Sequence, residues 1–176
     1  AAFLFDLDGT LLNTLDDLTD SVNFALGEMG CPLHTADEVR MMVGNSVIYL
    51  IEQALPKGTD KASFDRCLST FEAHYKTNMR NKTAPYDGVM QMLDELSTAG
   101  YKLAVVSNKP DVFTKQLVSE LFGQYIEDDK GNITDCLGFY PYYAKQFSKL
   151  RYNDCSVGEF NGMQIVGFKN LLSHSY

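Results

Sequence analysis

The chain of 176 residues lacks several features that would mark a specialised class of protein. No apolar run reaches the ~18 residues of a membrane span, and no basic segment followed by an apolar one opens the chain, so we expect a cytoplasmic protein without a membrane partner. Lys and Arg number 15 against 23 Asp and Glu, and this net charge of −8 disfavours nucleic acid as a partner. The 4 cysteines are scattered without a Cys-x-x-Cys pair, so we predict reduced thiols rather than zinc or redox chemistry.

Near the N-terminus, an apolar run leads into two aspartates one residue apart. Asp6 and Asp8 follow Phe3-Leu4-Phe5 and precede Gly9-Thr10. We predict a strand that is buried on both faces, and its alternation would project both carboxylates to one side with Leu7 turned away. Two carboxylates held together repel each other unless a hard cation such as Mg²⁺ neutralises them. The pattern therefore indicates a cation site that can handle phosphate, although the same residues also form ordinary turns.

Residues 14 to 81 carry helical signals and little strand signal. Apolar residues at helical spacing predict helices at residues 14–30, 35–43, 47–55 and 64–75. Thr14 is expected to cap the first helix, Thr35 and Glu38 form a capping-box pattern, and Ser46 can cap the third. His34 and His74 have no second ligand at metal spacing, so we expect surface histidines.

After residue 81 the pattern changes to that of an α/β protein. A helix at 89–96 ending near Gly100, a strand at 102–106 and a further helix capped by Asp111 are predicted. Together with the first strand, this order predicts a parallel α/β sheet, in which ligands gather at the carboxyl ends of strands. Both polar clusters, the aspartates and Ser107-Asn108-Lys109-Pro110, fall there. The apolar face of the last helix is expected to consist of Val112, Phe113, Leu117, Val118 and Leu121.

Two segments carry a family resemblance. Asp6-Leu7-Asp8-Gly9-Thr10-Leu11 resembles the first motif of the haloacid dehalogenase superfamily, and Pro85 to Pro110 resembles the second motif with its lead-in. The resemblance, which is to the phosphoglycolate phosphatase type, implies a Rossmann-like α/β core formed by residues 1–13 and 82–176. It also implies an inserted all-helical cap domain formed by residues 14–81.

The same resemblance implies roles for individual residues. Asp6 would be the nucleophile, Asp8 the general acid/base, and both would belong to a Mg²⁺ site. Ser107 and Asn108 would hold the transferring phosphoryl group. Gly44 and its neighbour Asn45 lie where relatives carry a substrate-facing turn, although a helix C-cap followed by a turn explains them equally well.

The function implied is a Mg²⁺-dependent phosphatase that hydrolyses a small, phosphoglycolate-like phosphate monoester through an aspartyl-phosphate intermediate. Asp8 separates this chain from the dehalogenases of the superfamily, which lack the second aspartate. Two alternatives stay open: a phosphomutase of the same superfamily, and a catalytically impaired relative that acts as a binding or regulatory module. The exact substrate and the oligomeric state also stay open.

The resemblance fades after about residue 122. The third motif, a Lys usually followed by Pro, and the fourth, Gly-Asp with another Asp nearby, are not found in residues 123–176. Lys145 and Lys149 are candidates for the lysine, and Glu159 offers a carboxylate. Residues 164–170 stand nearest to the fourth motif, with Phe168 where an aspartate belongs. A divergent C-terminus, a shifted reading frame and an incomplete sequence each explain this departure.

Overall fold

The computed structural model describes residues 2–126, 136–139, 157–160 and 163–166, with side chains for residues 3–126. The chain forms two compact units, one from Ala1–Leu11 with Pro85–Tyr176 and the other from Leu12–Ala84. These boundaries lie two and three residues from the expected ones at 13/14 and 81/82. Where the chain passes between the units, strands β2 (Leu12–Asn13) and β3 (Ala84–Pro85) form a small two-stranded sheet.

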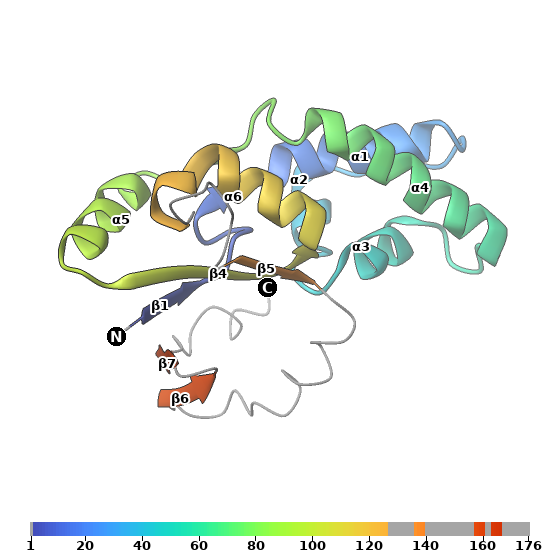
Figure 1. The fold of residues 1–176 in the computed structure, drawn as a ribbon. Helices are drawn as coiled ribbons and strands as arrows, with labels where there is room; N and C mark the ends of the chain where they lie inside the picture. The colour runs from blue at the N-terminus through green and yellow to red at the C-terminus, as the bar shows by residue number, and fades with distance from the viewer. Residues whose placement is uncertain (1, 127–135, 140–156, 161–162, 167–176) are drawn as a thin grey trace. The chain divides into compact units, whose positions relative to one another are not determined.

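The first unit contains a five-stranded sheet in the order β5-β4-β1-β7-β6 (Figure 1). Strand β1 runs parallel to both β4 and β7, and β4 runs parallel to β5, whereas the edge strand β6 is antiparallel to β7. Phe5 pairs with Val105, so β1 and β4 end at the same edge of the sheet. The predicted parallel α/β fold is thereby confirmed. The strand bounds are β1 Ala2–Phe5, β4 Lys102–Pro110, β5 Cys136–Phe139, β6 Val157–Phe160 and β7 Met163–Val166.

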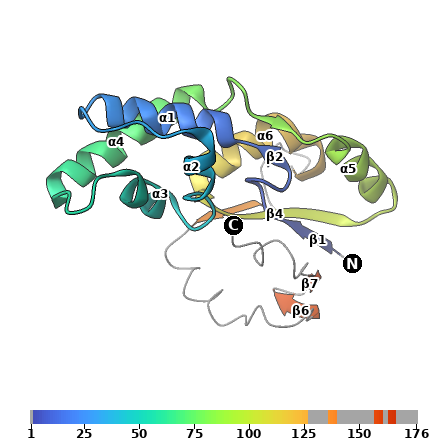
Figure 2. The same cartoon turned by 180° about the vertical axis from the view of Figure 1, so that it is seen from behind.

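Strand β1 is less buried than the sequence predicted. Its side chains from Phe3 to Phe5 are only half-buried, although a strand buried on both faces was expected. The rings of Phe3 and Phe5 stack with centroids 6.2 Å apart, and Phe3 meets Tyr101 edge-on at 5.1 Å. Helix α6 (Asp111–Ile126) packs against β4 and β5, and helix α5 (Val89–Thr98) packs against β4; Figures 1 and 2 show both helices. The apolar run of β1 does not encode which strands these helices cover, and their main contacts are not with β1.

Helix α6 and strand β4 also differ in detail from their predictions. Strand β4 continues through Pro110, with a register irregularity against β5 after Val106. Asp111 is the first residue of α6 rather than its preceding cap. Val112 was expected in the core but is 61% exposed. Phe113, Leu117 and Val118 are buried as predicted, and Leu121 is only partly buried. The buried face of α6 also includes Thr114, Phe122, Gly123 and Ile126.

The second unit is all-helical, as the sequence predicted. It consists of α1 (Leu15–Gly27), α2 (Ala36–Arg40), α3 (Val47–Ala54) and α4 (Lys61–Asn78). Three caps decide where these helices begin. The capping box of Thr35 and Glu38 is present on α2, and the Ser46 hydroxyl accepts the Tyr49 N–H on α3. Asp60 caps α4, which therefore begins earlier than expected.

Two turn residues behave differently from their predictions. Thr14 precedes α1 but makes no side-chain cap hydrogen bond. Gly44 has φ of +120° and lies in the turn between α2 and α3, beyond the C-cap of α2 at Met41. Gly44 therefore does not end a helix. Residues other than glycine rarely adopt this positive φ, which explains why a glycine stands here.

His34 and His74 are partly buried, and each has a ring nitrogen within hydrogen-bond distance of another residue. His34 is half-buried, and its Nε2 lies 2.9 Å from the Ala54 carbonyl oxygen. His74 is also half-buried; its Nδ1 lies 3.0 Å from the Ser21 Oγ, and its ring stacks on Phe24 at 4.2 Å. Helix α4, which carries His74, packs along α1. The core between the helices includes Val22, Ala25, Leu26, Ile51, Cys67, Phe71 and Tyr75.

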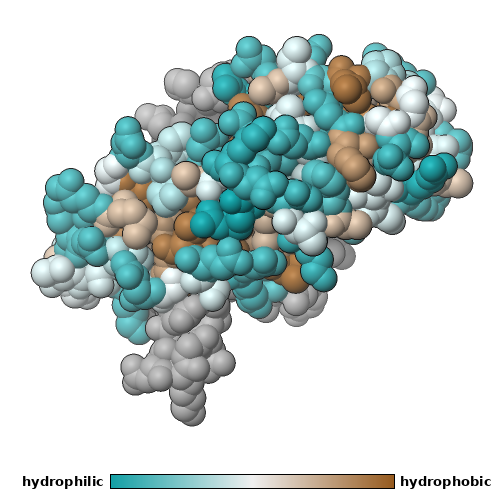
Figure 3. Space-filling view, turned by 90° about the horizontal axis from the view of Figure 1, so that it is seen from above, coloured by the Kyte–Doolittle hydropathy of each residue, from teal (hydrophilic) through white to brown (hydrophobic). Residues whose placement is uncertain are grey.

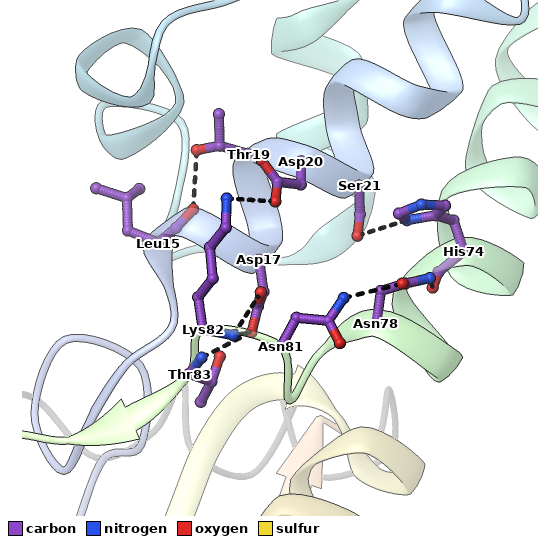
Figure 4. A network of polar contacts seen from close by, with 10 residues as sticks. All are labelled: Leu15, Asp17, Thr19, Asp20, Ser21, His74, Asn78, Asn81, Lys82 and Thr83. Carbon is purple, nitrogen blue, oxygen red and sulfur yellow. Dashed lines mark hydrogen bonds and ion pairs between the residues drawn. The ribbon is translucent and has the colours of Figure 1, made fainter.

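A buried carboxylate holds the two ends of the helical unit together (Figure 4). Asp17 on α1 is only 1% exposed. Its oxygens accept the Lys82 N–H at 3.0 Å and the Thr83 N–H at 2.8 Å, just before the chain leaves the unit. The Lys82 ammonium lies 2.7 Å from Asp20, one turn further along α1. Buried backbone donors need acceptors, so Asp17 fixes the exit segment against the entry helix.

Some large apolar side chains of the described residues are exposed. On the face that Figure 3 shows, hydrophobic patches are separated by hydrophilic residues. Leu33, Met41 and Val112 are among the most exposed large apolar side chains. Apolar side chains exposed singly are normal on proteins. Within the described part of the chain, no helix is both long and apolar enough to cross a membrane.

Candidate active site

The two aspartates lie directly after β1, at the carboxyl end of the strand. Leu7 is fully buried, whereas Asp6 and Asp8 on either side of it are partly exposed, which agrees with the predicted alternation. The Leu7 N–H donates to Asp6 Oδ1 at 2.7 Å. Gly9 then turns the chain with φ of +74°, and the Leu11 N–H donates back to the Leu7 carbonyl at 3.1 Å. The turn thus fixes both carboxylates on a short, hydrogen-bonded segment.

Burial dominates the electrostatics of Asp6. Desolvation, reinforced by the negative charge of Asp8, raises the pKa of Asp6 from 3.8 to about 6. The Leu7 N–H, the Ser107 hydroxyl and the charge of Lys109 act in the opposite direction and favour the carboxylate. The two aspartates are therefore close enough to repel each other. A cation bound between them would relieve that repulsion.

Strand β4 supplies the other half of the site. Ser107 and Lys109 are buried, and Asn108 between them is exposed, as strand alternation requires. The Ser107 hydroxyl is hydrogen-bonded to Asp6, and the Lys109 Nζ lies 3.2 Å from Asp8 Oδ1. The structure therefore gathers Asp6, Asp8, Ser107 and Lys109 at the shared edge of β1 and β4. Asn108, a predicted phosphoryl-binding residue, projects away from the face that carries Ser107 and Lys109.

Lys109 belongs to the site as well, although the family resemblance implied a role only for Ser107 and Asn108 on this strand. Its position two residues after Ser107 on a strand is a usable signal, because residues i and i+2 share a face. The other lysine candidates cannot be compared with it, since Lys145 and Lys149 lie outside the described residues. Phe168 also lies outside them, and Glu159 is described only in its backbone.

Asp6 and Asp8 are residues of the type that binds a hard cation, but two carboxyl groups are fewer than such a site usually has. Asp6 and Asp8 offer carboxylate oxygens, the donors that Mg²⁺ prefers. Among the residues with described side chains, no group of three or more His, Cys, Asp or Glu is arranged to hold a metal ion. The described side chains therefore contribute two carboxyl groups, those of Asp6 and Asp8, at this edge of the sheet.

Comparison with known proteins identifies the family of this chain. Residues 3–127 match the family model of haloacid dehalogenase-like hydrolases. The chain belongs to this family. The resemblance read from the first two motifs is thereby confirmed, and the match ends close to residue 122, where the resemblance fades.

Curated relatives narrow the likeness within the family. The chain is 35% identical over 121 residues to a phosphoglycolate phosphatase from Agrobacterium fabrum, with 67% of this chain and 52% of the relative covered. It is 37% identical over 123 residues to a phosphoglycolate phosphatase from Mesorhizobium japonicum, with 67% of this chain and 53% of the relative covered. The chain thus spans about half the length of the curated relatives it matches.

A solved structure supports the fold. The chain resembles the crystal structure of a predicted phosphoglycolate phosphatase from Haemophilus somnus, with a TM-score of 0.70 and 28% identity. The superposition covers 84% of this chain and 71% of that one. The predicted Rossmann-like core of the haloacid dehalogenase type is therefore confirmed.

Proposed function

We propose that this chain is a phosphatase that hydrolyses a small phosphate monoester of the phosphoglycolate type. The observation that carries the proposal is the meeting of Asp6, Asp8, Ser107 and Lys109 at the carboxyl ends of two adjacent parallel strands. Ligands of open α/β sheets bind at such edges. The similarity to phosphoglycolate phosphatases from two organisms supports the substrate class.

In the proposed reaction, an oxygen of Asp6 attacks the phosphorus atom and the bond from phosphorus to the leaving oxygen breaks. Asp8 donates a proton to the departing alkoxide, which leaves as an alcohol. Water then attacks the aspartyl-phosphate on Asp6, with Asp8 accepting its proton, and inorganic phosphate is released. The Ser107 hydroxyl, which lies against Asp6, is placed to donate a hydrogen bond to a phosphoryl oxygen.

Mg²⁺ is the cofactor that fits the proposal. Asp6 would hold it through its carboxylate and Asp8 through its backbone carbonyl, which leaves the Asp8 side chain available as the acid, and the charge of the ion would offset the charges of the phosphate and the carboxylate. Desolvation keeps the pKa of Asp6 near 6 without a cation, so a neighbouring positive charge favours the ionised nucleophile. The helical unit, residues 12–84, is proposed to act as a cap that selects the substrate and excludes water.

The test is hydrolysis of 2-phosphoglycolate and of 4-nitrophenyl phosphate by the full chain, with Mg²⁺ or with a chelator. Released phosphate should depend on Mg²⁺ in the wild-type protein. Asp6→Asn should reduce the rate by on the order of 10³-fold or more, because it removes the nucleophile. The exposed Asp16→Asn on α1 is the matched control and should retain the wild-type rate.

Other outcomes point to the alternatives. Equal background hydrolysis by the wild-type protein and Asp6→Asn would contradict the proposal. It would favour a non-catalytic relative, which should still bind inorganic phosphate or vanadate in calorimetry. Transfer of the phosphoryl group to a sugar phosphate, in place of release to water, would instead indicate a mutase.

A further inference from the structure

The ammonium group of Lys109 is buried beside the predicted general acid. The Lys109 side chain is 3% exposed and that of Asp8 is 14% exposed, and Lys109 Nζ lies 3.2 Å from Asp8 Oδ1. Burial of an ammonium group is costly unless a partner compensates its charge. The negative charges of Asp8, which is in direct contact, and of Asp6 nearby compensate this buried ammonium group.

The backbone around Lys109 is fixed on both sides. The Lys109 N–H donates to the Ser107 Oγ at 3.3 Å. The Lys109 carbonyl accepts the hydroxyl of Thr114 at 3.1 Å, and Thr114 on α6 is fully buried. Strand β4 and the first turn of α6 thus hold the Cα of Lys109 in place. A lysine anchored in this way presents its ammonium group with little conformational freedom.

We propose that Lys109 is the positioning residue for Asp8: its ammonium group fixes the orientation of the Asp8 side chain, so that the protonated carboxyl group delivers its proton to the leaving oxygen. This inference rests on the proposed phosphatase function. The positive charge beside the acid then comes from the second motif, in which Lys109 follows Ser107 and Asn108.

The test uses two substrates that differ in their need for a proton. The 4-nitrophenolate group leaves readily without protonation, whereas the alkoxide of 2-phosphoglycolate requires it. Lys109→Met should lower kcat for 2-phosphoglycolate by about 30-fold and for 4-nitrophenyl phosphate by less than about 3-fold. The larger loss is below the roughly 10²- to 10⁴-fold that a general acid contributes, because Asp8 itself is retained. Lys109→Arg should restore part of the loss on 2-phosphoglycolate. A structural defect would lower both rates by the same factor, and that result would overturn the inference.

Lys115→Met is the matched control. Lys115 lies on α6, is 44% exposed and pairs with Asp111 at 2.9 Å. Its removal should leave both rates unchanged. Thermal unfolding establishes that each variant is folded. If Lys109→Met is not folded, Lys109→Gln replaces it, because the glutamine amide keeps a hydrogen-bond donor without the positive charge.

Failure of the proposed function is distinguishable from failure of this inference. If the wild-type protein hydrolyses neither ester, the phosphatase proposal fails, and crystal structures of the wild-type protein and the variants then decide the role of Lys109. An Asp8 carboxylate that turns away in Lys109→Met but keeps its orientation in Lys109→Arg supports the positioning role. The same Asp8 rotamer in all three proteins overturns it.

Discussion

The Asp17 carboxylate accepts the backbone N–H of Thr83 at 2.8 Å, although 66 residues separate the two along the chain. The same carboxylate accepts the N–H of Lys82. Helix α1 and the exit segment of the helical unit are thus joined through one buried side chain. Such a contact fixes the two chain segments by which this unit continues into the sheet-containing one.

Asp17→Ala should destabilise the protein by about 3 kcal/mol, because it leaves buried backbone donors without an acceptor. Asp17→Asn keeps one carbonyl acceptor and should cost about half as much. Urea unfolding at pH 7 measures both. Asp20→Ala is the control on the same helix, since Asp20 makes an exposed ion pair with Lys82. A midpoint for Asp17→Ala as close to wild type as that of Asp20→Ala would contradict the role of Asp17.

Two valines on α6 test the packing of the sheet-containing unit. Val118 is fully buried, whereas Val112 is 61% exposed. Val118→Ala should lower the free energy of unfolding by about 2 kcal/mol, because it removes buried methyl groups and leaves a cavity. Val112→Ala should change it by less than about 0.5 kcal/mol. Thermal or urea unfolding measures the stability of both variants. Equal losses of stability would show that Val118 is not more buried than Val112, so that the buried face of α6 is assigned wrongly.

The sequence predicted the elements of the fold because each has a local cause. Caps at Thr35 and Ser46 supply acceptors to helix N-termini, and they appear where expected. Val112 was assigned to the core from helical spacing alone. That spacing gives the direction of a side chain but not the extent of the surface that covers it, and Val112 is exposed although Phe113 and Thr114 beside it are buried.

One part of the site could be predicted because it, too, has a local cause in the sequence. Asp6 and Asp8 follow one strand directly, so their shared orientation could be read from alternation. The pairing of Lys109 with Asp8 depends on β4 lying beside β1 in a register that aligns Phe5 with Val105. Register between strands about 100 residues apart is a tertiary property, and one chain's sequence does not encode it locally.

The raised pKa of Asp6 predicts a pH-dependent stability of the metal-free protein. Its folded-state pKa of about 6 lies above the ordinary 3.8, so the native protein binds this proton more tightly than the unfolded chain does. The contribution of this bound proton to the free energy of unfolding is fully present below about pH 3.8 and is lost as the pH rises through 6. In a chelator, the free energy of unfolding relative to Asp6→Asn should fall by about 2 kcal/mol between pH 4.5 and 7.5.

Urea unfolding at several pH values measures this difference. The comparison with Asp6→Asn removes the contributions of the other carboxyl groups, which titrate in both proteins. A difference between the two proteins that is constant from pH 4.5 to 7.5 would show that the pKa of Asp6 is not raised in the folded state.

Ser107→Ala should lower kcat/KM for 2-phosphoglycolate by about 10- to 100-fold, because the hydroxyl is expected to donate to a charged phosphoryl oxygen. Ser107→Thr keeps a hydroxyl on the same carbon and should retain much of the activity. The loss should be similar for 4-nitrophenyl phosphate, since both esters carry the same phosphoryl group, in contrast to the leaving-group dependence expected for Lys109. Steady-state kinetics with both esters separates the two roles. A Ser107→Ala defect confined to the alkyl ester would place Ser107 with the general acid instead of with the phosphoryl group.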